Sequence, residues 1–198
     1  MKHLIAPAFL LAASCATTPA ASGEDRFFQR LSSLCGKAFE GRIASPPAEG
    51  DAAFAGKRLV MHVRHCSPGE IRIPFQVGED RSRTWVITKT AGGLRLKHDH
   101  RHRDGSEDKL TQYGGDSVQH GSRTDRQGAS RQEFPADAYS TGLFTRENLP
   151  QSAANIWALE VHPERMFGYE LRRPGRFFRV EFDLSRPVAS PPPPWGSR

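Results

Sequence analysis

The chain has 198 residues, which is enough for one globular domain and leaves little for a second. Hydrophobic residues make up 37% and charged residues 25%, and the two signs of charge are interleaved, which excludes a chain that is disordered throughout. The net charge of +6 indicates either a surface attracted to anionic lipid or polysaccharide or a merely solvated basic exterior. No recognisable nucleic-acid module accompanies the charge, so we expect no nucleic-acid partner.

Residues 1–14 have the pattern of a bacterial signal peptide. Lys2 provides a positively charged start, and Leu4–Ala13 is an apolar run too short to span a bilayer. Small residues precede Cys15, as in the lipobox of bacterial lipoproteins. We expect export and lipidation of Cys15, which gives a periplasmic or outer-membrane-anchored lipoprotein. The alternative is ordinary cleavage slightly further on.

The chain has three cysteines. Lipidation or removal of Cys15 leaves Cys35 and Cys66, and an oxidising periplasm permits a disulfide between them. Two unpaired buried thiols, or a pair of metal ligands, are the alternatives.

A short amphipathic helix is predicted near the start of the mature chain. Ser22–Asp25 resembles a capping box, and Gly36 can end the helix. Its apolar residues recur at helical spacing, so they must cover another element: Phe27, Phe28, Leu31 and Leu34.

From Lys37 onward the hydrophobic period changes to two, which is typical of strands with one buried and one solvated face. Short turns separate these segments, as at Ser67–Gly69 and Arg173–Gly175. Short links make antiparallel neighbours, and closure removes exposed edges. The sequence therefore predicts an all-β fold, a single antiparallel up-and-down barrel of about ten strands plugged by the helix.

The predicted organisation is a signal peptide, a flexible tether over residues 15–23, a barrel domain over 24–188, and a disordered proline-rich tail over 189–198. Residues 137–151 read as a longer, partly helical excursion. The glycines of Tyr113–Asp116 indicate a turn.

The helix that runs into Leu34–Gly41, followed by a meander, resembles the calycin superfamily, which comprises lipocalins and their bacterial relatives. The chain is also similar to uncharacterised exported bacterial proteins with segments like His98–His102, Tyr113–Gly115 and Phe134–Asp137. The resemblance implies a barrel and implies no known activity.

One segment is rich in groups that could bind a ligand. On a strand, His98, His100 and His102 share a face with two leucines, so they point into the barrel if the leucines do. Two imidazoles at this spacing can converge on one metal ion, and His65 is a fourth candidate ligand. One alternative is that the histidines are polar residues at the rim of the barrel. Another is that they form a hydrogen-bonding floor for an anionic or polar ligand in the cavity.

We therefore expect a non-catalytic cell-envelope protein that binds a small hydrophobic or amphipathic ligand inside the barrel. The expected ligand-binding residues are the three histidines together with Met61, Phe75 and Trp85. One alternative is a metal-dependent enzyme or metal carrier that uses the histidine cluster. Another is a structural or interaction lipoprotein that acts through its tail or basic exterior. The sequence indicates no particular cofactor.

Overall fold

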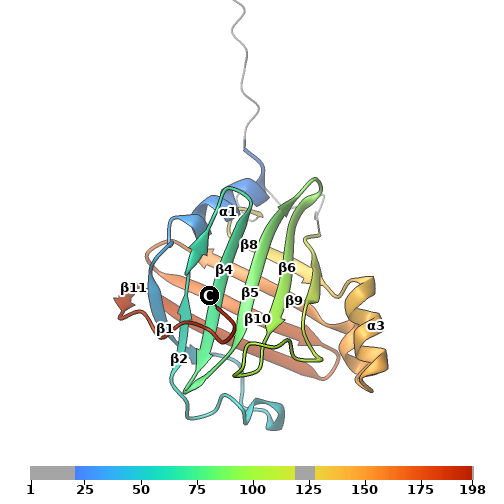
Figure 1. Ribbon diagram of the computed structural model, residues 1–198. Helices are drawn as coiled ribbons and strands as arrows, with labels where there is room; N and C mark the ends of the chain where they lie inside the picture. Colours follow the sequence, from blue (N-terminus) through green and yellow to red (C-terminus); the bar gives the residue numbers. More distant parts are fainter. Residues whose placement is uncertain (1–20, 119–127, 198) are drawn as a thin grey trace, which may run out of the picture.

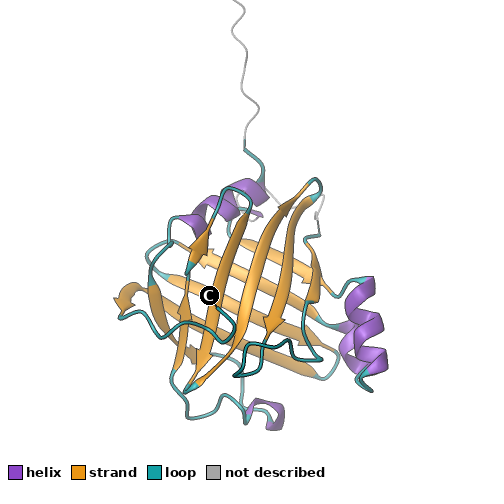
Figure 2. Ribbon diagram, viewed as in Figure 1, coloured by secondary structure: helices purple, strands orange, loops and turns teal. Residues whose placement is uncertain are grey.

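The computed structural model describes residues 21–118 and 128–197. The predicted signal peptide, Cys15 and most of the tether lie outside these ranges. Within them the protein is almost entirely antiparallel sheet with a few short helices (Figure 1, Figure 2). None of the described helices is long and apolar enough to cross a membrane.

The strands follow the predicted alternation closely. Their bounds are β1 Ala38–Ile43, β2 Leu59–His62, β3 His65–Cys66, β4 Glu70–Val77, β5 Asp80–Thr90, β6 Gly93–His100, β7 Tyr113–Asp116, β8 Arg131–Pro135, β9 Ile156–His162, β10 Met166–Arg173 and β11 Arg176–Val188. The sheet order is β7-β6-β5-β4-β2-β1-β11-β10-β9-β8, with the short β3 paired to β4. Neighbours are antiparallel throughout, so the predicted up-and-down barrel of about ten strands is confirmed.

The two ends of this sheet, β7 and β8, come together and nearly close the barrel. The Val118 N–H donates to the Glu133 carbonyl at 3.1 Å, and the Asp137 N–H donates to the Gly114 carbonyl at 2.9 Å. A Cβ atom at Gly115 would lie only 1.7 Å from the Pro135 carbonyl oxygen. Glycine is therefore required where the two backbones meet. The predicted turn at 113–116 is wrong, because these glycines allow close approach within a strand.

The N-terminal helix α1, Gly23–Ser32, covers one end of the barrel (Figure 1). As predicted, the Ser22 hydroxyl caps it by accepting the Asp25 N–H at 3.0 Å. Phe27 and Leu31 on its inner face are completely buried in the common core. The predicted plug helix is confirmed.

A disulfide joins Cys35, just after α1, to Cys66 in β3, with the Cα atoms 6.3 Å apart. The Gly36 N–H donates to the Val63 carbonyl at 2.7 Å beside it. The predicted disulfide is confirmed, and it ties the plug helix to the sheet.

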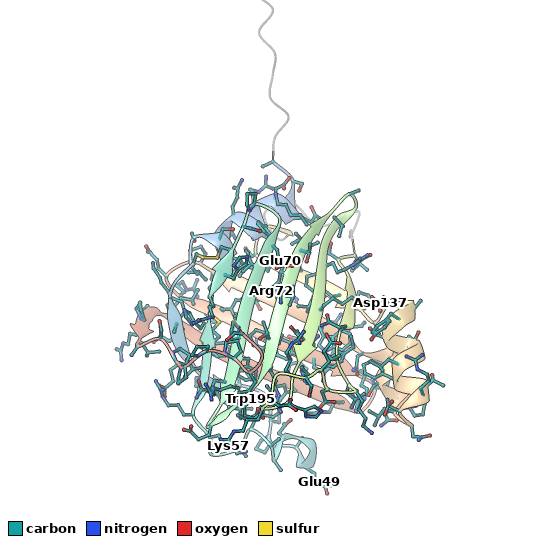
Figure 3. All side chains as sticks on the ribbon, viewed as in Figure 1. Glu49, Lys57, Glu70, Arg72, Asp137 and Trp195 are labelled. Carbon is teal, nitrogen blue, oxygen red and sulfur yellow. A yellow bond between two sulfur atoms is a disulfide. The ribbon has the colours of Figure 1, made fainter. Side chains whose placement is uncertain are left out.

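Residues 137–151 are partly helical, as predicted. They form α3, Ala138–Arg146, and the start of the 3-10 helix η2, Pro150–Ala154. Another 3-10 turn, η1, spans Glu49–Asp51 at the end of the barrel away from α1, where Figure 3 labels Glu49.

Arginine and glutamate side chains form an ion-pair network on the outer face of β8–β11. Arg131 donates to Glu170 at 2.8 Å, and Arg172 donates to Glu133 at 2.9 Å. Burial raises the pKa of Glu133, but the hydrogen bond and charge of Arg172, with Arg131, outweigh it and lower the pKa to about 2. The arginines of this face are therefore neutralised locally by neighbouring glutamates.

The proline-rich tail lies along the outside of the sheet, with Trp195 near the lower end of the strands (Figure 3). The backbone N–H of Trp195 donates to the Arg81 carbonyl at 3.1 Å, and the Arg81 guanidinium donates to the Pro193 carbonyl at 3.0 Å. This placement differs from the disordered tail predicted for 189–198, because backbone groups of the tail find partners on β5.

Candidate functional site

A pocket of about 270 Å³ lies inside the barrel at the end opposite α1; we call it the barrel pocket. It is bordered by the segment after η1, by Leu110 in the loop between β6 and β7, and by α3 and η2. Aromatic rings dominate its walls, among them Phe54, Phe75, Trp85, Trp157, Tyr169 and Phe178.

These rings pack on one another and form a continuous wall. The centroid of Trp85 lies 4.5 Å from that of Tyr169 and 4.9 Å from that of Phe75, and both pairs are stacked. Trp85 and Phe75 come from adjacent strands, β5 and β4, and Tyr169 comes from β10 across the barrel. Such a surface suits a planar or aliphatic apolar body.

His98 is the most deeply buried polar side chain of the barrel pocket, with 2% of its surface exposed. Its Nδ1 lies 3.1 Å from the Tyr113 carbonyl oxygen, and its Nε2 lies 2.9 Å from the Tyr169 hydroxyl. Because a carbonyl only accepts, Nδ1 carries the proton and Nε2 accepts the Tyr169 O–H. Burial raises the pKa of Tyr169, so the hydroxyl keeps the proton that it donates.

His100 stands next to His98 on the same strand face. Its Nε2 lies 3.2 Å from the Tyr113 hydroxyl. Burial, and then the charge of Arg83, lower its pKa to about 4. Burial, and then the charge of His100, lower the pKa of His98 to about 3. Both imidazoles are therefore neutral at neutral pH and contribute hydrogen bonds rather than charge.

We expect the side-chain NMR signals of His98 and His100 to remain those of neutral imidazole at about pH 5. In the unfolded protein both groups should titrate near the ordinary value of 6.5. Because the folded pKa values are depressed, the unfolded state binds more protons below pH 6.5. The stability that these two groups contribute is thus present above pH 6.5 and falls as the pH drops, toward about 4 for His100 and about 3 for His98. Protonation of either ring near 6.5 in the folded protein would contradict this arrangement.

The structure places four of the six expected ligand-binding residues at the barrel pocket. Phe75, Trp85, His98 and His100 line it. Met61 is completely buried in the core but is not part of the lining. The two-residue period therefore predicted which residues face inward, but not where the core leaves space.

His102 does not share the face of the other two histidines. Strand β6 ends at His100, and His102 is exposed in a turn where its carbonyl accepts the Gly105 N–H at 2.9 Å. The turn residues Asp104 and Gly105 end the alternation earlier than we predicted, since Gly105 has a φ of +89°.

The four histidines of the alternative metal-site interpretation do not come together. His65 lies exposed on the outer side of the sheet, whereas His98 points into the barrel. Both ring nitrogens of His98 already have hydrogen-bond partners there. Across residues 21–118 and 128–197, no group of three or more His, Cys, Asp or Glu side chains could hold a metal ion.

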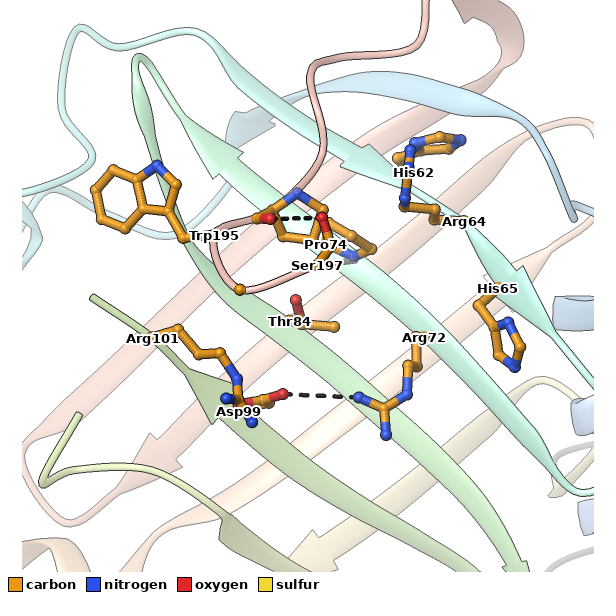
Figure 4. Close-up of a pocket in the computed structure, with 12 residues that line it drawn as sticks. His62, Arg64, His65, Arg72, Pro74, Thr84, Asp99, Arg101, Trp195 and Ser197 are labelled. Carbon is orange, nitrogen blue, oxygen red and sulfur yellow. Dashed lines mark hydrogen bonds and ion pairs between the residues drawn. The ribbon is translucent and has the colours of Figure 1, made fainter. Parts of the chain in front are cut away.

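A second hollow of about 550 Å³, the outer pocket, lies between the tail and the outer face of β2, β4, β5 and β6 (Figure 4). Arg72 and Arg101 flank Asp99, with nitrogen–oxygen distances of 3.6 Å and 3.0 Å. Arg72 also pairs with Glu70 at 2.7 Å. The charges at the centre of the outer pocket are thus paired with one another. Trp195 lines this pocket, but no wall of packed aromatic rings like that of the barrel pocket surrounds it among the described residues.

Sequence reasoning missed several residues of the barrel pocket. Tyr113, Trp157 and Tyr169 all belong to it. Two of them could have been predicted from the sequence. Trp157 and Tyr169 occupy inward positions of strands β9 and β10, whose hydrophobic alternation is clear. Arg173 and Arg176 flank a hairpin turn, and both lie at the mouth of the pocket.

Comparison with known proteins finds no family model, no curated protein and no solved structure that matches this chain. The nearly closed antiparallel barrel is compatible with the calycin-like fold that the sequence resembles.

Proposed function

We propose that this chain is an exported, non-catalytic cell-envelope protein that binds a small hydrophobic or amphipathic ligand in the barrel pocket. The observation that carries the proposal is the aromatic-walled space of about 270 Å³ inside a nearly closed barrel. Its size is just below the usual range of about 300–1,000 Å³ for ligand pockets, which suits a small molecule. Polar side chains such as His98 and Arg173 interrupt the aromatic lining. A relationship to calycins, whose barrels enclose a ligand, is part of the same proposal.

Two observations support export. The first is the leader pattern of residues 1–14, and the second is the disulfide between Cys35 and Cys66, because disulfides persist in oxidising compartments. We further propose that a lipid on Cys15 anchors the protein to the outer membrane or that the mature protein lies free in the periplasm.

Titration with the uncharged fluorescent probe N-phenyl-1-naphthylamine tests ligand binding. We expect a saturable rise in fluorescence with the native protein, because the probe is brighter in apolar surroundings. Leu149→Trp adds bulk at the mouth of the barrel pocket and should weaken binding about tenfold or more.

Phe177→Trp is the matched control, because Phe177 is 44% exposed and does not line the barrel pocket. It should leave the affinity for the probe unchanged. Absence of saturable binding, or equal affinity in all three proteins, would refute the proposed function.

A further inference from the structure

The guanidinium groups of Arg83, Arg173 and Arg176 gather at the barrel pocket. Hairpin geometry explains two of them, because β10 ends at Arg173 and β11 begins at Arg176. No aspartate or glutamate is among the described residues that line this pocket. The mouth is therefore positive.

Two of these three arginines pair with carboxylates of residues that do not themselves line the barrel pocket. Arg83 pairs with Asp80, and its guanidinium also lies 5.5 Å from the centroid of the Phe54 ring. Arg176 pairs with Asp51, whose side chain is only 5% exposed. These two charges are compensated within the protein.

Arg173 is different. Its Nη1 donates to the Asn155 amide oxygen at 2.9 Å, which is a neutral partner. Among the described residues it has no ion pair with a carboxylate. Burial, and then the charge of Arg176, lower its pKa, which means that its surroundings disfavour the charged form. Because an arginine side chain stays protonated in proteins, one uncompensated positive charge remains at the mouth.

We infer that the ligand is a small monocarboxylate with an apolar body, whose carboxylate binds Arg173 while its body lies against the aromatic wall. This inference rests on the proposed function and specifies its ligand class. One uncompensated charge matches a monoanion better than a phosphate dianion. The neutral histidines deeper in the pocket offer no competing charge for the carboxylate.

Octanoate and octanol form a matched pair of probes, because they share a chain length and differ in charge. Both are measured by displacement of N-phenyl-1-naphthylamine from the full chain. We expect octanoate to bind about tenfold more tightly than octanol at low salt, and added salt to weaken octanoate alone. Arg173→Gln should weaken octanoate about tenfold and change octanol less than about twofold.

Arg42→Gln is the control for net charge, since Arg42 lies on the outer face and its side chain is 77% exposed. It should leave both affinities unchanged. Arg173→Lys keeps the charge and should restore most of the preference for octanoate, which separates loss of charge from loss of folding.

Equal binding of octanoate and octanol to the native protein would overturn the monocarboxylate inference and leave the proposed function intact. A folded Arg173→Gln variant that still prefers octanoate over octanol as strongly as the native protein would also overturn the monocarboxylate inference alone. Failure of octanoate, octanol and the naphthylamine probe to bind would overturn the proposed function and this inference together.

Discussion

Gly115→Ala is expected to destabilise the protein by about 3 kcal/mol or more. The new Cβ would lie 1.7 Å from the Pro135 carbonyl oxygen, which is backbone and cannot turn aside like a flexible side chain. The substitution must therefore push β7 away from β8. That separation would break the hydrogen bonds that nearly close the barrel, including the one from Asp137 to Gly114. Chemical denaturation measures the loss.

Gly92→Ala is the matched control in the β5–β6 hairpin. Apart from its two chain neighbours, no described residue has an atom within 4 Å of the Cβ it would add, and its φ is not in the left-handed region. We expect a change of less than about 1 kcal/mol in either direction. Equal stability of the two variants would show that β7 and β8 do not approach one another as described.

Replacing both Cys35 and Cys66 with serine is expected to lower the free energy of unfolding by about 3–4 kcal/mol. The two cysteines are separated by 31 positions, and cross-linking such a loop restricts the unfolded chain. Hydrogen exchange in α1 should also accelerate, because the disulfide holds the end of this helix against the sheet.

A reducing agent should destabilise the native protein to the same extent and leave the double serine variant unchanged. If reduction does not alter the unfolding midpoint of the native protein, the disulfide contributes nothing to stability and this account of the plug is wrong.

Local periodicity predicted most of the barrel. The alternation in Leu94–His100 is confirmed because each inward residue of β6 is packed against the core or the barrel pocket. The helix was equally predictable, since its cap and its apolar stripe are both local features. The disulfide followed from counting cysteines and from the expected compartment.

The sequence-based predictions were wrong or incomplete where segments distant in the sequence meet in the fold. Nothing local at Tyr113–Asp116 distinguishes a turn from a strand whose glycines face another backbone. Trp195 lies against β5 through contacts between residues more than a hundred positions apart. Arg173 belongs to the site because a hairpin carries it to the mouth, and its lack of a carboxylate partner depends on the whole surroundings of that mouth.

The NMR signals of the three indole N–H groups test the central claim most directly, because the chain has only three tryptophans. Trp85 and Trp157 line the barrel pocket, whereas Trp195 lines the outer pocket. Trp195→Phe assigns the third signal. On addition of octanoate we expect the signals of Trp85 and Trp157 to shift and saturate together while that of Trp195 stays in place. A shift confined to Trp195, or no shift in any of the three, would contradict a ligand site inside the barrel.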